Sequence, residues 1–121
     1  MKAQLKAIIV EEISEALSEL HPKPLGEFAL DLRLVIGVDG KIGGDDFYLT
    51  ICTPAYLSQL ADECYDVMGC SYLIVNHFDY NKIKQIIERY ICYATGDSWY
   101  QLAMQIGTFA RWEFDNYFEN N

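Results

Sequence analysis

The chain has 121 residues, of which 51% are hydrophobic and 22% charged, and its formal net charge is −9 at pH 7. This length fits a single domain over residues 1–121, because two pieces would each be too small to bury a useful core, and the apolar content excludes wholesale disorder. No apolar run approaches the roughly 20 residues of a membrane span, and the first one is too short for a signal peptide. We therefore expect a cytoplasmic protein with no membrane partner.

The charge is distributed unevenly along the chain. Residues 1–66 hold twelve acidic and five basic residues, whereas residues 67–121 hold six and four. Such a surface suits nucleic acid poorly, because phosphates must be neutralised by lysine and arginine, so we expect no direct nucleic-acid partner. An acidic first half fits either a basic partner or a device for solubility, and charge alone favours the second.

The first segment predicts a strand over residues 2–10. Four apolar residues then suit a short helix that ends before Pro22: Ile9, Ile13, Leu17 and Leu20. Three acidic residues would line the solvent face of that helix: Glu11, Glu15 and Glu19. The strand and helix patterns overlap at Ile9, so the structure of residues 11–27 stays open.

The clearest pattern is an alternation with a period of two in residues 28–38, which predicts a strand with one buried face. The apolar face consists of Phe28, Leu30, Leu32, Leu34, Ile36 and Val38. Asp31 and Arg33 lie on the other face. Asp39-Gly40 and Gly43-Gly44 then predict a turn into a second strand over residues 46–53, and thus an antiparallel hairpin. Its apolar face consists of Phe47, Leu49 and Ile51.

Thr53 and Pro54 predict the start of a helix, because threonine caps free N–H groups and proline is tolerated at the first helical position. Apolar residues continue at helical spacing: Leu57, Leu60, Ala61 and Cys64. After Gly69, residues 70–76 form a nearly continuous apolar run of strand length. We expect this strand inside the sheet rather than at its edge.

Two consecutive helices are predicted near the C-terminus. The first begins at the cap Asp79, stops at Gly96 and carries an apolar stripe: Ile83, Ile86, Ile87, Tyr90, Ile91 and Ala94. The second is capped by Ser98 with Gln101, or by Asp97. It is defined by Trp99, Leu102, Ala103, Ile106 and Ala110. The predicted fold class is α+β, with helices packed on a mainly antiparallel sheet of about four strands.

The four cysteines predict thiols rather than disulfides. Cys52 and Cys92 lie inside apolar segments and are interpreted as small core residues. Cys64 and Cys70 could approach each other across a loop, and free thiols are favoured there over a bridge.

The sequence offers little for catalysis. His21 and His77 lack paired-ligand spacing, so a catalytic or metal role is disfavoured for His77. The loop of residues 39–46 lacks the alternating oxygen ligands of a calcium loop and the GK[ST] of a phosphate loop. We therefore predict no catalytic, cofactor-binding or metal-binding residue.

Residues 99–118 concentrate seven aromatic residues: Trp99, Tyr100, Phe109, Trp112, Phe114, Tyr117 and Phe118. The terminal part alternates aromatic with mostly acidic residues. We interpret it as a tail clamped onto the sheet rather than as an exposed binding platform, because each buried ring contributes about 1.5–3 kcal/mol.

Several short motifs follow one another along the chain, and their order and spacing are informative. They are Ile36-Gly37, Cys52-Thr53-Pro54-Ala55-Tyr56-Leu57, Tyr72-Leu73-Ile74-Val75 with Phe78-Asp79-Tyr80, Gly96-Asp97-Ser98-Trp99, and Trp112-Glu113-Phe114-Asp115-Asn116-Tyr117. Together they resemble the immunity protein 8 family of bacterial polymorphic toxin and contact-dependent inhibition systems. The resemblance covers about Phe28 to Phe118, whereas the segment before Phe28 matches poorly. Tyr56 stands where members often carry tryptophan.

The resemblance implies a non-enzymatic antitoxin that binds the toxic C-terminal domain of a cognate effector. Such domains are often basic nucleases, and an acidic inhibitor would be steered to one and cover its phosphate-binding groove. Three acidic clusters are the candidate toxin contacts: Glu11, Glu12, Glu15 and Glu19; Asp45 and Asp46; Asp62, Glu63 and Asp66. Trp99, Trp112 and Tyr117 are interpreted as core, because a partner-specific surface should vary with the toxin.

Two other classes of function stay open. A small acidic binding or regulatory module would recover several unrelated basic proteins in a pull-down. A small enzyme with a dispersed site would hold an ordered metal ion between His77 and nearby carboxylates.

Overall fold

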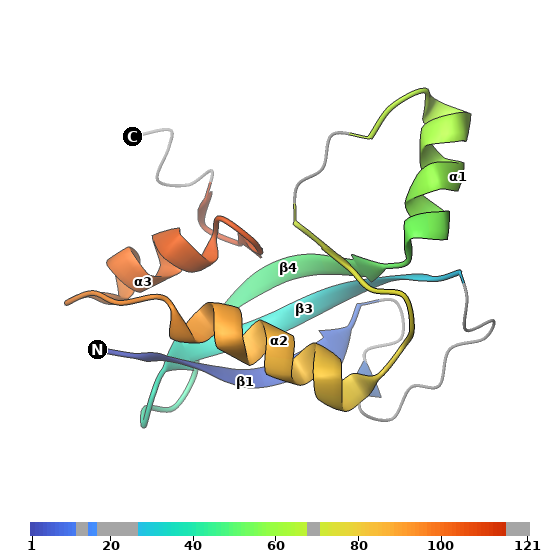
Figure 1. Ribbon diagram of the computed structural model, residues 1–121. Coiled ribbons are helices and arrows are strands. Elements are labelled where there is room, and N and C mark those ends of the chain that lie inside the picture. The colour runs from blue at the N-terminus through green and yellow to red at the C-terminus, as the bar shows by residue number, and fades with distance from the viewer. Residues whose placement is uncertain (12–14, 17–26, 68–70, 116–121) are drawn as a thin grey trace.

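The computed structural model describes residues 1–11, 15–16, 27–67 and 71–115 (Figure 1). In chain order the elements are β1 (Ala3–Val10), β2 (Glu15–Ala16), β3 (Ala29–Val38), β4 (Asp45–Cys52), α1 (Pro54–Cys64), β5 (Tyr72–Ile74), α2 (Tyr80–Cys92), α3 (Trp99–Ile106) and β6 (Arg111–Trp112). The strands form one sheet in the order β2-β1-β3-β4-β5, and β6 pairs with β4. Only the β4–β5 pairing is parallel among these. The predicted α+β class is confirmed, and β2 and β6 account for strands beyond the four expected.

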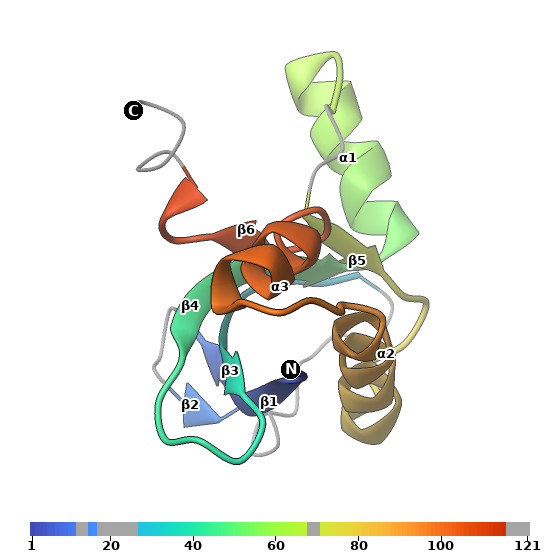
Figure 2. The ribbon, with the colours of Figure 1, turned by 90° about the vertical axis from the view of Figure 1, so that its left-hand side faces the viewer.

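The predicted hairpin is confirmed as β3 and β4, which pair antiparallel from Ala29↔Cys52 to Ile36↔Asp45. Gly40 and Gly43 adopt positive φ angles of 81° and 90° in the turn, a conformation that glycine adopts without steric cost. Most of the predicted apolar positions of both strands are buried: Leu32, Leu34, Ile36, Phe47, Leu49 and Ile51. Leu30 and Val38, predicted on the same face, are only half-buried. The sheet curves around α2 and α3, which lie on this buried side (Figure 2).

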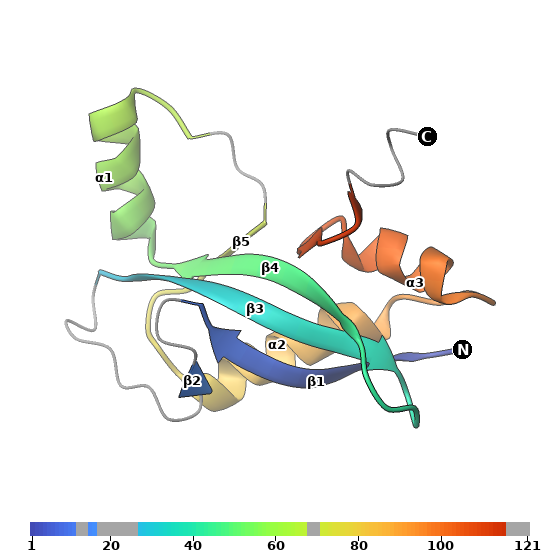
Figure 3. The ribbon, with the colours of Figure 1, turned by 180° about the vertical axis from the view of Figure 1, so that it is seen from behind.

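Seen from behind, the opposite face of the sheet has none of the three described helices over it (Figure 3). Because side chains alternate along a strand, this face receives the residues between the core positions. It is called the uncovered face below. Helix α1 rises beyond one end of it, and β6 lies near the other (Figure 3).

Thr53 caps α1 as predicted and also fastens the helix to the hairpin. Its buried hydroxyl accepts hydrogen bonds from the N–H of Tyr56 at 3.4 Å and from the N–H of Phe28 at 3.2 Å. Pro54 occupies the first turn. However, α1 buries none of its residues in the core, so its apolar stripe is only half-buried.

We expect Thr53→Ala to lower the free energy of unfolding by about 2 kcal/mol, because two backbone donors lose their acceptor. Thr53→Ser retains the oxygen and should lose less than about 1 kcal/mol. Urea denaturation of both variants measures the difference. Equal losses would show that the hydroxyl does not carry this contribution.

The expectation that residues 70–76 lie inside the sheet is wrong. Of the described residues 71–76, Tyr72–Ile74 form a strand, β5, and it lies at the edge, where Ile74 is 52% exposed. The remainder of the same β4 edge is taken by β6. Leu73 and Val75 pack against the core instead, which explains the apolar run without a central position.

Both predicted C-terminal helices are confirmed. Helix α2 is capped by the Asp79 side chain and buries Ile83, Ile87 and Ile91, but it ends at Cys92 rather than at Gly96. Two residues expected to be buried face solvent, because they lie off this stripe: Tyr90 and Cys92.

The capping box of α3 is present in a shifted form. The Ser98 hydroxyl accepts from the N–H of Gln101 at 3.2 Å. The Gln101 side chain accepts in return from the N–H of Asp97 at 2.7 Å, one residue before the cap. Ser98, rather than Asp97, is therefore the cap of α3.

The short helix proposed before Pro22 is wrong where the structure describes this segment. Glu15–Ala16 form strand β2, which pairs antiparallel with Ile9 and Val10 of β1. Ile13, Leu17 and Leu20 lie outside the described residues. Across the described part of the chain, no helix has the length and apolar content needed to cross a membrane.

The prediction of a clamped C-terminal tail is met by the two tryptophans, whereas Tyr100 and Phe114 are exposed. Trp112 is 4% exposed and stacks on Phe47, with the ring centroids 6.3 Å apart and the planes at 13°. Trp99 packs against the same core and meets Phe47 edge-on at 6.3 Å. Tyr117 and Phe118 lie outside the described residues.

Candidate functional site

The nine predicted contact residues do not form one surface. Glu12 and Glu19 lie outside the described residues, and Glu15 is described only as part of strand β2. Of the other six, the structure brings Glu11 and Asp46 together on the uncovered face. It places Asp62, Glu63 and Asp66 on or just after α1, at the end of that face.

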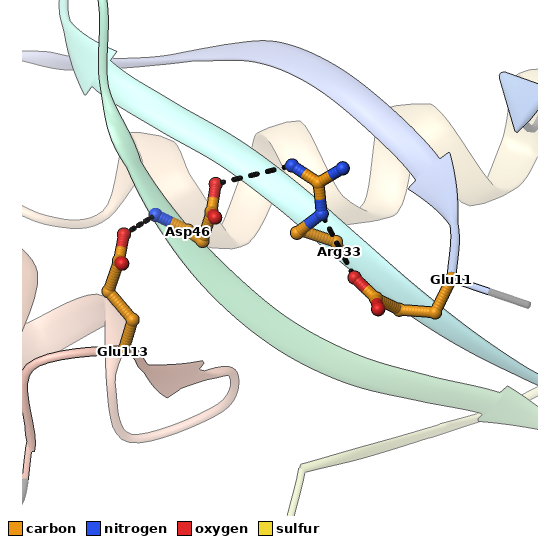
Figure 4. Close-up of polar contacts among 4 residues, drawn as sticks. All are labelled: Glu11, Arg33, Asp46 and Glu113. Carbon is orange, nitrogen blue, oxygen red and sulfur yellow. Dashed lines mark hydrogen bonds and ion pairs between the residues drawn. The ribbon is translucent and has the colours of Figure 1, made fainter. Parts of the chain in front are cut away.

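Arg33 joins Glu11 and Asp46 across the uncovered face (Figure 4). Its Nε lies 2.9 Å from the Glu11 carboxylate, and its Nη1 lies 3.6 Å from the Asp46 carboxylate. The three side chains are 30–40% exposed. Ion pairs this accessible contribute about 0–1 kcal/mol to stability. Two carboxylates around one guanidinium leave the cluster negative, so it can attract a further cation from solvent.

Glu113 adds a third carboxylate beside this cluster from the segment that follows β6. It accepts a hydrogen bond from the backbone N–H of Asp46, and its own N–H donates to the Asp46 carbonyl at 3.0 Å. Figure 4 shows Glu113 and Arg33 on opposite sides of Asp46. The C-terminal segment therefore extends the acidic surface across β4.

Asp45 has a different role from Asp46, because adjacent residues in a strand point to opposite faces. Its Oδ2 accepts from the indole N–H of Trp99 at 2.7 Å and from that of Trp112 at 3.0 Å. A charged acceptor of two indole donors holds α3 and β6 against β4. The pair Asp45 and Asp46 is therefore split between a packing contact and the uncovered face.

A groove of about 480 Å³ opens on the uncovered face beside this cluster. Its polar lining comes from four strands and the segments that border them: Glu11, Asp31, Tyr48, Thr50, Ser71, Tyr72 and Arg111. Thr50 donates to Asp31 at 2.7 Å, and the Arg111 guanidinium lies 4.6 Å from the centre of the Tyr48 ring. The groove thus combines aromatic, acidic and basic groups in reach of a partner.

Tyr56 lies at the start of α1, near enough to the groove residues Tyr72 and Asp31 for them to affect its pKa. Partial burial raises the pKa of its phenol, and the neighbouring Tyr72 and Asp31 raise it further. Burial also raises the pKa of the Cys52 thiol, which fits its core position. Cys64 and Cys92 are free and exposed, while Cys70 lies outside the described residues.

Sequence reasoning missed most of the groove. The strand alternation already placed Asp31 and Arg33 on the outer face, and the pairing of the hairpin would add Tyr48 and Thr50. Nothing in the local sequence indicates that Arg111 and Glu113 return to β4, because that pairing joins residues more than 60 positions apart.

The residues that the structure describes form no group of three or more His, Cys, Asp or Glu side chains able to hold a metal ion. His77 is exposed on the segment that leads to α2, and His21 lies outside the described residues. Within the loop of residues 39–46, residues 39–44 form the predicted turn of the hairpin, and Asp45 and Asp46 begin β4.

Comparison with known proteins gives one match. Residues 3–117 match the family model described as Immunity protein 8. The match begins near the start of β1, so it extends into the segment before Phe28, which we expected to match poorly. No curated protein and no solved structure matches the chain. The chain therefore belongs to the immunity protein 8 family, whose name marks an immunity protein of a toxin system.

Proposed function

We propose that this chain binds and neutralises the C-terminal toxin domain of a cognate contact-dependent inhibition or polymorphic toxin effector. The family match over residues 3–117 carries this proposal. The chain acts as a stoichiometric inhibitor in the cytoplasm and not as an enzyme. Its partner is a basic nuclease, and inhibition comes from covering the groove in which the nuclease holds phosphate.

The charge of the chain supports a basic partner. The chain contains eighteen acidic and nine basic residues, and no lysine or arginine occurs between Lys41 and Lys82. A negative surface accelerates encounter with a cationic protein and disfavours direct binding of nucleic acid. The carboxylates around Arg33 and those of α1 both belong to this surface.

The nine acidic residues serve different parts of the proposed complex. Glu11 and Asp46 meet the toxin on the uncovered face. Glu12, Glu15 and Glu19 are proposed as further toxin contacts from the sequence. Asp62, Glu63 and Asp66 meet the toxin at α1. Asp45 supports the interface indirectly, because it accepts hydrogen bonds from Trp99 and Trp112 and so holds α3 and β6 in place.

The test is co-expression with the cognate toxin domain, sought in the reading frames that neighbour this gene, followed by measurement of affinity between the purified proteins. Wild type should restore growth and bind. Glu11→Lys with Asp46→Lys should weaken binding about tenfold or more at low salt and less at high salt, because the contribution is electrostatic. Exposed Glu88 of α2 lies on the other side of the sheet, so Glu88→Lys should leave affinity within about twofold.

Failure of wild type to bind or to rescue growth would contradict the proposed function. Binding that the double charge reversal leaves unchanged at both salt concentrations would instead remove the uncovered face from the interface.

A further inference from the structure

We propose that α1, together with Tyr65 and Asp66 at its end, is the projecting anchor that the toxin domain grips. This inference rests on the proposed function and names the surface and the complementary chemistry of the partner. That partner surface is an apolar pocket with a basic rim on the toxin domain.

Helix α1 lacks the burial that normally holds a surface helix in place. A helix of a globular protein packs an apolar stripe onto the core, and α2 does so with three buried isoleucines. By contrast, α1 buries no residue, although Tyr56, Leu57 and Leu60 recur at helical spacing. All three ribbon views show α1 standing away from the sheet (Figures 1, 2 and 3). This apolar stripe is half-buried, and its exposed part is therefore available to another molecule.

Tyr65 is the second and independent observation. It forms the C-cap of α1 at a φ of 75°, in the positive-φ region that glycine adopts more readily than other residues. The tyrosine side chain is 94% exposed, so it gains no burial in exchange for the unfavourable backbone. Backbone strain of this kind gathers at binding sites, and tyrosine is enriched among the residues that dominate interfaces. A binding role explains both features of Tyr65.

Residues 62–66, at and just after the end of α1, are called the tip, and the acidic residues among them favour a basic partner. Asp62, Glu63 and Asp66 are exposed next to Tyr65, and Glu63 is held by the side chain of Gln59 at 3.3 Å. No lysine or arginine occurs between residues 41 and 82, so neither α1 nor the stretch of sequence on either side of it contains a basic residue. A second copy of the chain would bring the same charges together and be repelled, whereas a basic toxin domain would be attracted.

The decisive variant is Tyr65→Gly, because it removes the ring and relieves the backbone at the same time. We expect its affinity for the toxin domain to fall about tenfold or more, while the midpoint of thermal unfolding does not fall. The matched control is Tyr93→Ala, which removes a tyrosine that is 67% exposed at the C-cap of α2. Its affinity should stay within about twofold of wild type.

A second measurement uses wild-type protein alone. Cys64 in the last turn of α1 and Cys92 at the end of α2 are both exposed thiols. Bound toxin domain should protect Cys64 from a maleimide, with the modified peptides identified by mass spectrometry, while Cys92 stays reactive.

The outcomes separate the two proposals. If wild type binds the toxin and Tyr65→Gly binds equally, or if Cys64 stays as reactive as Cys92, the anchor is wrong and the proposed function stands. If wild type binds no toxin, both are wrong. A concentration-dependent dimer that Tyr65→Gly abolishes would assign the tip to a second copy and overturn the anchor.

Discussion

Replacing Trp112 with alanine is expected to lower the free energy of unfolding by about 3–5 kcal/mol. The indole is almost completely buried, stacks on Phe47 and donates a 3.0 Å hydrogen bond to Asp45. Its removal leaves a cavity under β6 and takes one of two indole donors from a carboxylate. Because β6 has only two residues, the C-terminal segment should also separate from β4.

Chemical denaturation of Trp112→Ala measures the stability, and hydrogen exchange at Glu113 reports the separation. Arg111→Ala is the matched control in the same strand, since Arg111 is exposed and only covers the Tyr48 ring. Arg111→Ala should lower the free energy of unfolding by about 1 kcal/mol or less. If Trp112→Ala also lowered the free energy of unfolding by less than about 1 kcal/mol, the packing of Trp112 on Phe47 would contribute little to stability.

Gly37→Ala is expected to destabilise the chain by about 3 kcal/mol, the second-largest effect. A Cβ at Gly37 would overlap the backbone carbonyl of Gly43, and one at Gly44 would lie 2.6 Å from the carbonyl oxygen of Ile36. Both obstacles are backbone atoms, so the hairpin itself must move to make room. Close backbone packing therefore explains why glycine follows Ile36 in this motif.

Gly40→Ala provides the comparison in the turn of the same hairpin. No atom lies within 4 Å of its added Cβ, but the φ of 81° is unfavourable for alanine, which predicts a cost of about 1 kcal/mol. Thermal unfolding of the two variants should separate them clearly. Equal shifts in the unfolding midpoint would show that close backbone approach at Gly37 is not limiting.

Elements specified by neighbouring residues could be predicted from the sequence. The alternation in residues 28–38, the turn glycines, and the caps Thr53, Asp79 and Ser98 each encode their structure within a few positions. The hairpin and the three later helices follow from them. The stripe of α2 was predicted equally well, except that Tyr90 and Cys92 lie just outside its buried face.

Features that depend on distant pairing could not be predicted. The apolar run at residues 70–76 predicts burial but not an edge position, which follows from β6 occupying the rest of the β4 edge. The same pairing brings Glu113 beside Asp46 and Trp112 beside Asp45. Adjacent acidic residues in the sequence therefore acquired separate roles, one in packing and one on the uncovered face.

The central claim is neutralisation by binding without turnover, and titration of the toxin tests it most directly. The activity of a fixed amount of the purified toxin domain is measured with increasing amounts of this chain, at toxin concentrations well above the dissociation constant. The account predicts a linear loss of activity that ends at one molecule of inhibitor per toxin and does not progress with time. Loss of activity that continues under substoichiometric inhibitor, or full activity at a large excess, would contradict it.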